Sequence, residues 1–192
     1  MIKLRKVKKI ENAILAVCLM LFSSQIKAQK KLGVEDVIIW SKSRLLTWND
    51  FEKIGYGDGE NNNKAISVIE LSFIPVYYTD KTFSFEVVSY FVRKHSKTTT
   101  ICNELLLNHE QYHFNIAELL ARKFREHQHG LGKKNLSRYE YDLLINWFKK
   151  VYQSYQDNYD RETKHGASST DQKNWEKKID VALQDLENYK LY

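Results

Sequence analysis

The pattern of apolar and polar positions divides the chain into a strand-like first half and a helical second half. Residues 65–78 and 82–93 form two runs in which apolar side chains alternate with polar ones. This period of two is typical of strands that bury one face. The three residues Thr79-Asp80-Lys81 between the runs suffice for a tight turn, so the runs predict an antiparallel hairpin. Pro75 lacks a backbone N–H, which favours the edge of the sheet or the end of the strand.

Three stretches of the second half, residues 100–127, 136–155 and 171–189, repeat apolar residues at helical spacing. The first is expected to end at Gly130 and Gly132. Strand-like runs come first and helical runs follow, which predicts an α+β fold: a small antiparallel sheet of three or more strands packed on the first helix, with two further helices. The side chains expected to face the core of the second and third helices are Tyr139, Leu143, Leu144, Trp147, Phe148 and Val151, then Trp175, Ile179, Ala182, Leu183 and Leu186.

Shorter signals precede the hairpin. Val37 to Trp40 is apolar and short, and predicts a brief strand. Residues 46–51 place Trp48 and Phe51 around a Thr/Asn/Asp capping cluster, which predicts a short helical turn anchored by the two aromatic rings. Residues 55–64 are rich in Gly and Asn and predict a loop.

The first 28 residues have the three regions of a secretory signal peptide. Basic residues concentrate in residues 1–12, an unbroken apolar run covers residues 13–22, and the segment then leads to the small residue Ala28. The apolar run is too short to span a bilayer as a stable helix. We therefore expect cleavage after Ala28, a single mature domain at residues 29–192, and a secreted or periplasmic protein with no stable membrane insertion after cleavage.

Most of the positive charge of the chain lies in this signal. The whole sequence has a formal net charge of +6, and residues 1–28 hold six Lys or Arg and one Glu. The remainder therefore carries a net charge of only about +1, and no nucleic-acid partner is expected. Cys102 is the one cysteine after the signal, so a disulfide framework is not expected either.

The strongest chemical signal is His109-Glu110-Gln111-Tyr112-His113, inside the first predicted helix. His109 and His113 are four residues apart, so one face of a helix can present both imidazoles to one metal ion. Glu110 lies one residue further, about 100° around the helix axis. It can therefore sit beside the metal without ligating it, where a general base for an activated water belongs.

A catalytic zinc usually takes three protein ligands and one water, so the third ligand must come from elsewhere in the chain. Glu118 is on the same predicted helix, but nine residues after His109, and so about 180° around the axis from that ligand. Glu140 on the second predicted helix remains a candidate. So do Asp160 and His165, in the polar connection between the second and third helices.

Three stretches resemble an uncharacterised family of secreted or periplasmic bacterial proteins that are predicted to be zinc-dependent proteases. The matching stretches, in order, are Trp40-Ser41…Arg44-x-Leu46-Thr47-Trp48-x-Asp50-Phe51, then His109-Glu110-Gln111-x-His113-Phe114-x-Ile116-Ala117-Glu118-x-x-Ala121-Arg122, then Tyr159-Asp160-x-x-Thr163-x-His165-Gly166 followed by Gln172-x-x-Trp175. Together they span nearly the whole mature chain. Asn115 is a departure, because such sequences more often carry Asp there.

The resemblance implies a zincin-like metallopeptidase domain whose third metal ligand lies between Asp160 and Gly166. Of these residues His165 ranks first, because a neutral imidazole is a preferred zinc ligand and Gly166 lets the backbone turn tightly beside it. Asp160 ranks second, as a ligand or as the carboxylate that orients a ligating histidine. Tyr159 or Tyr112 would donate to the oxyanion, and the sequence does not choose between them.

Three classes of function are consistent with these signals. In the first, a zinc peptidase, zinc polarises the peptide carbonyl and Glu110 passes a proton from water to the leaving amine of a peptide or protein substrate. The second is a non-catalytic envelope protein with a closed, structural zinc site. The third is a surface module whose 12 Tyr and four Trp bind a polymer such as a glycan. Most of these aromatics lie at helical core spacing, so we expect the first class.

Overall fold

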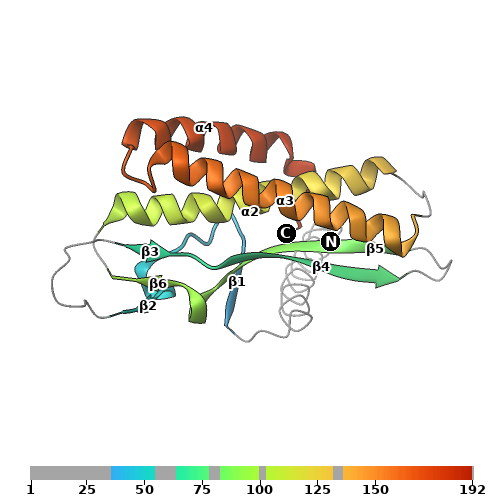
Figure 1. Cartoon of the computed structure of the whole chain (residues 1–192), viewed down its shortest axis with the longest axis horizontal. Coiled ribbons are helices and arrows are strands. Elements are labelled where there is room, and N and C mark those ends of the chain that lie inside the picture. Colours follow the sequence, from blue (N-terminus) through green and yellow to red (C-terminus); the bar gives the residue numbers. More distant parts are fainter. Residues whose placement is uncertain (1–35, 55–63, 78–82, 100–102, 132–135, 192) are drawn as a thin grey trace, which may run out of the picture. The chain divides into compact units, whose positions relative to one another are not determined.

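The computed structural model describes residues 36–54, 64–77, 83–99, 103–131 and 136–191. Residues 36–191 form one compact unit in which three long helices cover one face of a sheet (Figure 1), and the predicted α+β class is confirmed. The expected signal peptide, most of the 55–64 loop and the turn at residues 79–81 lie outside the described residues. Among the described helices, none has the length and apolar character needed to cross a membrane.

The predicted hairpin forms the main sheet. β4 (Ile69–Tyr77) and β5 (Phe83–Val92) pair antiparallel, from Ile69 opposite Phe91 to Tyr77 opposite Phe83. β1 (Val37–Ile39) pairs with the other side of β5, so the strand order is β1-β5-β4. β4 is therefore an edge strand of this sheet, and Pro75 lies exposed on it, as its missing N–H predicted.

A second, smaller sheet lies beside the first. It consists of β2 (Glu52–Lys53), β6 (Lys97–Thr98) and β3 (Ala65–Ile66) in the order β2-β6-β3, with β2 parallel and β3 antiparallel to β6. Two 3-10 turns connect to it, η1 (Trp48–Asp50) and η2 (Arg93–His95). η1 is the predicted turn: Thr47 and Asp50 form its capping box, and Trp48 and Phe51 are buried beside it.

The chain passes from the small sheet to the large one at Ser67 and Val68, and hydrogen bonds fix this junction. The backbone N–H of Val68 donates to Ser96 Oγ at 2.9 Å, and its carbonyl accepts the N–H of Val92 at 2.8 Å. Ser96 is itself fully buried and donates to the Val92 carbonyl at 2.8 Å. The position of Ser67 is therefore set by two sheets at once.

The motif helix is α2 (Glu104–Leu131), which packs on the helix-facing side of β5. It begins after Asn103, whose side chain accepts the N–H of Leu106 at 3.0 Å. It continues through Gly130, so the prediction is wrong for that glycine; it ends at Leu131, and Gly132 lies outside the described residues. One glycine costs only about 1 kcal/mol in a helix, which the packing of 28 residues outweighs.

Glu118 lies on the side of α2 that faces β5, away from the histidines. Its carboxylate accepts the Ser89 hydroxyl at 2.7 Å and pairs with Arg122 at 3.0 Å and Arg125 at 3.2 Å. Arg122 also donates to the carbonyl of Leu183 at 2.6 Å. Glu118 therefore joins α2 to the sheet and to the C-terminal helix, which agrees with the helical-wheel argument against its being a metal ligand.

α3 (Arg138–Thr163) begins at a capping box formed by Ser137 and Glu140. It ends at Thr163 and not near residue 155, so the second predicted helix was too short and Asp160 lies on α3, not in a connection. Glu140 is exposed at the helix start. Twenty residues of helix separate it from Asp160, a rise of about 30 Å, which removes Glu140 as a candidate ligand.

The buried face of α3 also differs from the prediction. Tyr139, Leu143 and Trp147 were expected in the core but are 71, 52 and 57% exposed. The first half of α3 carries two apolar stripes, and periodicity alone cannot choose between them. The stripe that is buried continues toward the second half of the helix, where it meets β4 and α2; its members are Tyr141, Ile145, Phe148, Val151 and Tyr152.

α4 (Ser169–Asp185) and the 3-10 turn η3 (Glu187–Tyr189) form the third predicted helix. Ile179, Leu183 and Leu186 are buried as predicted, and Trp175 and Ala182 are partly buried in the same cluster. This cluster joins α4 to α2 and to the C-terminal half of α3. It thereby places the end of α3 beside the motif.

Candidate metal centre

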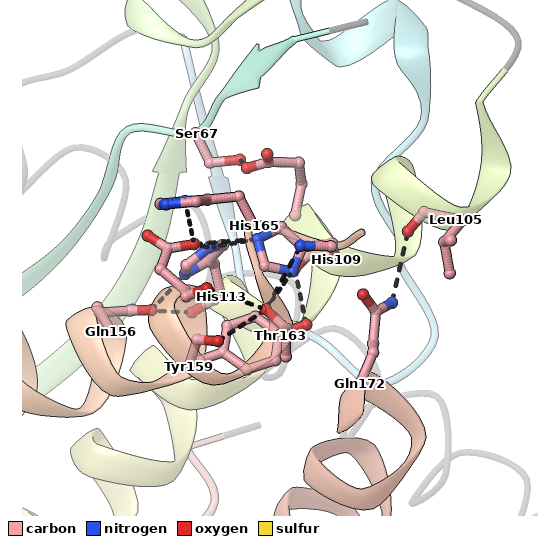
Figure 2. A network of polar contacts seen from close by, with 12 residues as sticks. Ser67, Leu105, His109, His113, Gln156, Tyr159, Thr163, His165 and Gln172 are labelled. Carbon is pink, nitrogen blue, oxygen red and sulfur yellow. Dashed lines mark hydrogen bonds and ion pairs between the residues drawn. The ribbon is translucent and has the colours of Figure 1, made fainter. Parts of the chain in front are cut away.

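Two imidazoles of α2 and one carboxylate of α3 converge on a single point. His109 Nε2 lies 3.1 Å from His113 Nε2. Oδ1 of Asp160 lies 3.1 Å from the first nitrogen and 3.0 Å from the second. In the described part of the chain, the ligand atoms of these three residues lie close enough together to hold one metal ion. Figure 2 shows His109 and His113 close to Gln156, Tyr159 and Thr163 of the neighbouring helix.

Gln156 fixes the proton of His113. The side-chain amide of Gln156 donates to the His113 backbone carbonyl at 3.0 Å, so its oxygen is the atom 2.6 Å from His113 Nδ1. That oxygen can only accept, so Nδ1 carries the proton. The lone pair of Nε2 is left free to face Asp160 and His109, which is the tautomer a metal ligand needs.

Thr163 sets the tautomer of His109, and Tyr159 holds its ring in place. The Thr163 hydroxyl donates to the Tyr159 carbonyl at 2.7 Å, so its lone pair faces His109 Nδ1 at 3.5 Å. The Tyr159 ring stacks on the His109 ring at a centroid distance of 4.6 Å and an interplanar angle of 16°. His109 Nε2 therefore also presents a lone pair to the shared point.

The donor atoms suit a small divalent cation. Two imidazole lone pairs and a carboxylate oxygen at 3.0–3.1 Å from one another repel unless a proton or a cation lies between them. Zinc–nitrogen and zinc–oxygen bonds are about 2.0–2.2 Å, so neighbouring ligands of a tetrahedral ion lie roughly 3.3 Å apart. The observed spacing is close to that value. Among described residues, three donors take part, which fits the ligand count of an open catalytic site.

The charges of this group perturb its titration. Burial alone would raise the pKa of Asp160, but hydrogen bonds and charge interactions with His113 and His109 outweigh burial and hold that pKa well below its usual range. Burial would lower the pKa of His113, yet its hydrogen bond to Asp160 and the nearby Glu110 carboxylate raise it. The arrangement favours positive charge at the shared point.

Glu110 lies beside this group and is buried, as a general base beside a metal would be. One of its carboxylate oxygens, Oε2, accepts a hydrogen bond from the Ser67 hydroxyl at the junction of the two sheets. A cavity of about 750 Å³ opens in front of the group. Its lining includes the two histidines, Glu110 and Asp160, together with the chain from Lys64 to Ile69 and the C-terminal half of α3.

His165, the residue ranked first as the third ligand, lies outside the three-donor group. Its Nδ1 is 3.3 Å from Asp160 Oδ1, and the side chain is 79% exposed at the cavity. The geometry therefore favours Asp160 as the ligand and His165 as a neighbour that orients it, which reverses the expected roles. The backbone N–H of His165 also donates to the Asp160 carbonyl at 2.8 Å.

The two tyrosines expected at the oxyanion are placed elsewhere. Tyr159 has no exposed surface, lies under the histidine rings, and donates to the His109 carbonyl at 3.4 Å. Tyr112 donates to Asp180 on α4 at 2.9 Å. Neither lines the cavity. The tyrosine that does is Tyr152, whose pKa is raised by burial to about 12.

Three supporting residues were missed by the sequence reasoning: Ser67, Tyr152 and Gln156. Tyr152, Gln156 and Asp160 are spaced four residues apart and share one face of α3. That pattern was visible in the sequence, but it has meaning only if the helix extends to residue 160. Ser67 comes from a chain junction that no local sequence signal marks.

The turn after α3 brings the backbone against His109. Lys164, His165 and Gly166 have φ of 55°, 53° and 80°, so three successive residues adopt the left-handed conformation. A Cβ added to Gly166 would lie 3.0 Å from both Cβ and Cγ of His109. The glycine is needed here both for its φ and for this close approach.

We expect Gly166→Ala to lower stability and to weaken metal binding together. The left-handed conformation costs a non-glycine residue about 1–2 kcal/mol, and the added methyl group would push the His109 ring from its position. Urea unfolding of the metal-free protein and metal titration would measure the two effects. Gly130→Ala is the matched control: a Cβ there meets nothing within 4 Å, and a gain of about 0.5–1 kcal/mol is expected. Equal metal affinity in wild type and Gly166→Ala would contradict the placement of Gly166 against His109.

Comparisons of the chain with models of protein families, with curated protein sequences and with solved structures find no significant match. The zincin-like fold and the family resemblance therefore stay expectations. The chemistry of the site has to be argued from its own residues.

Proposed function

We propose that the protein is a metal-dependent peptidase with a zinc site formed by His109, His113 and Asp160. The observation that carries the proposal is the convergence of two imidazole nitrogens and one carboxylate oxygen beside a buried carboxylate that lines a cavity. A structural metal site usually has four protein ligands and is closed. Here the described residues supply three, and the cavity leaves room beside them, which supports a catalytic role.

The chain's own residues account for the proton transfers of hydrolysis. Bound zinc would supply polarisation of the substrate carbonyl and a lowered pKa of water. Ser67 holds one oxygen of Glu110, so the other is available to accept a proton from the attacking water. Glu110 then delivers that proton to the leaving nitrogen as the C–N bond breaks. Gln156 and Thr163 keep both histidines in the tautomer that the site needs.

A backbone edge beside the site supports a peptide as the substrate. The Thr99 N–H donates to the Lys64 carbonyl at 2.9 Å, and the Lys64 N–H donates to Thr99 Oγ1 at 2.9 Å. Hydrogen-bonded pairs of this kind alternate with non-bonded pairs along an antiparallel ladder. Ala65 therefore directs its N–H and C=O away from β6, and it lines the cavity. A free strand edge recognises an extended peptide through main-chain hydrogen bonds. We propose in addition that the protein is secreted or periplasmic, which rests on the features of residues 1–28.

Metal titration and peptide hydrolysis together test this function. The purified mature chain should bind about one equivalent of zinc, and His109→Ala or His113→Ala should abolish this binding. The zinc-loaded protein should cleave members of a peptide mixture, detected by mass spectrometry, and a chelator should stop the cleavage. Zinc binding without cleavage of any peptide would favour a structural site instead.

A further inference from the structure

The cavity in front of the metal group ends abruptly on one side. The Tyr152 hydroxyl donates to the carbonyl of Ile69 at 3.0 Å, which ties α3 to the first residue of β4. The cavity lining follows the chain from Lys64 to Ile69 and includes no later residue of β4. From α3 it begins at Tyr152. Tyr152 and Ile69 therefore form the end wall of the cavity.

Beyond this wall the space between α3 and β4 is filled by side chains. Leu71 and Phe73 of β4 pack into the core, and the Phe73 ring contacts Phe124 at a centroid distance of 5.0 Å. The Lys149 ammonium lies 5.9 Å from the centre of the Phe73 ring. These side chains close the helix-facing side of β4 past Tyr152, so the cavity does not continue there.

The distance from the wall to the reacting groups is short. Glu110 is held at Ser67, and Ile69 is only two residues further along the chain. Two residues span at most about 7 Å. A substrate whose reacting carbonyl lies beside Glu110 can therefore place only one or two residues between that carbonyl and the wall.

Charges and strand direction indicate which end of a peptide lies at the wall. Of the described residues in the lining, Lys64 is the one Lys or Arg, and it lies at the far end from Tyr152. A carboxylate at the wall would therefore meet no Lys or Arg of the lining, whose carboxylates are Glu110 and Asp160. Antiparallel pairing with residues 64–67, the slightly more stable arrangement, also directs the amino end of a peptide toward Ile69.

We propose that the protein is an exopeptidase that removes one or two residues from the amino end of a peptide, and that Tyr152 sets this limit. The inference rests on the proposed peptidase function. Water adds to the carbonyl carbon of the first or second residue, and the C–N bond that follows it breaks. The proton passes through Glu110 to the leaving nitrogen, so the products are a short fragment with a new carboxylate and a shortened chain with a free amine.

A decapeptide library randomised at its first four positions, prepared in four forms, tests the inference. The forms have free ends, an acetylated amino end, an amidated carboxyl end, or a head-to-tail cyclised backbone. Wild type should release fragments of one or two residues from the free and the amidated forms. Acetylation should slow release by about 10–200-fold, the discrimination of a pocket against one extra group, and the cyclic form should not be cleaved.

Two variants of Tyr152 separate the effect of its ring, which forms the end wall, from the effect of its hydrogen bond to the Ile69 carbonyl. Tyr152→Phe keeps the ring and should keep the end preference. Tyr152→Ala removes the ring and should allow cleavage at internal bonds and of the cyclic form, while zinc stoichiometry stays unchanged. Cleavage of the cyclic form by wild type would overturn the exopeptidase inference and leave the peptidase proposal standing. Slowing by amidation and not by acetylation would overturn the assigned direction.

A binding measurement covers the case in which no form is cleaved, which would be a failure of the proposed function. The Glu110→Gln variant, loaded with zinc, should bind the free-ended library at least about tenfold more tightly than the cyclic one by calorimetry. Equal affinity, or no binding of either, would overturn the end-wall inference independently of turnover.

Discussion

Glu110→Gln should reduce peptide turnover by about 10²–10⁴-fold and leave zinc binding and the fold intact. The amide has almost the shape of the carboxylate, and its oxygen can still accept the Ser67 hydroxyl that holds Glu110 Oε2. It cannot accept a proton from water. Single-turnover kinetics on a cleaved peptide, with zinc titration of the same preparation, would separate the loss of chemistry from any loss of metal.

Glu126→Gln is the matched control, because Glu126 is an exposed glutamate on the same helix. It should change neither turnover nor zinc binding. If Glu110→Gln turned over as fast as wild type, Glu110 would not be the base. If it lost zinc, the carboxylate would be part of the metal site, and the roles of the side chains around the shared point would need to be reassigned.

The hairpin and the motif helix could be predicted because each rests on a strong local pattern. In β4 and β5 alternate side chains face the helices, and Pro75 marks the edge by its missing donor. In α2 the spacing of His109 and His113 alone places both rings on one face. These features depend on periods of two and 3.6 residues, which follow from the backbone geometry of strands and helices and not from the neighbouring elements.

The sequence could not place the candidate third ligands relative to the two histidines, because their positions depend on where α3 ends. A helix that stopped near residue 155 would leave Asp160 and His165 equivalent in a loop. The helix reaches Thr163, so Asp160 lies in line with Gln156 on the face toward α2, and His165 falls in the left-handed turn beyond. The residue at the helix end is Lys164 and not a glycine, so no usual stop signal marks the position.

The buried face of α3 illustrates the same limit in packing. Trp147 and Phe148 are adjacent in sequence, yet one is 57% exposed and the other is buried. Both belong to apolar stripes with helical spacing, so the choice between the stripes is made by the partner. Phe148 packs against Phe124 of α2 at a centroid distance of 4.7 Å, and this contact is formed only in the folded chain.

Asp160→Asn should weaken zinc binding far more than His165→Ala does. The Asp160 carboxylate contributes both a ligand atom and a negative charge at 3.0–3.1 Å from the two imidazole nitrogens. Asparagine keeps the shape and loses the charge. His165 contacts only Asp160 in this group, at 3.3 Å, so its loss should cost about the 10–100-fold typical of residues that orient a ligand. Competition with a chromogenic chelator would measure both affinities.

Asp157→Asn provides the matched control, since Asp157 lies on the same helix and is exposed. Its zinc affinity should equal that of wild type. The opposite order of effects, with zinc binding abolished in His165→Ala and retained in Asp160→Asn, would make His165 the ligand and require the turn at residues 164–166 to bring its ring inward. A large loss in both variants, with Asp157→Asn unaffected, would indicate a site in which Asp160 and His165 both ligate. Such a site would have four protein ligands and no open position, and it would turn the conclusion from a peptidase toward a structural metal centre.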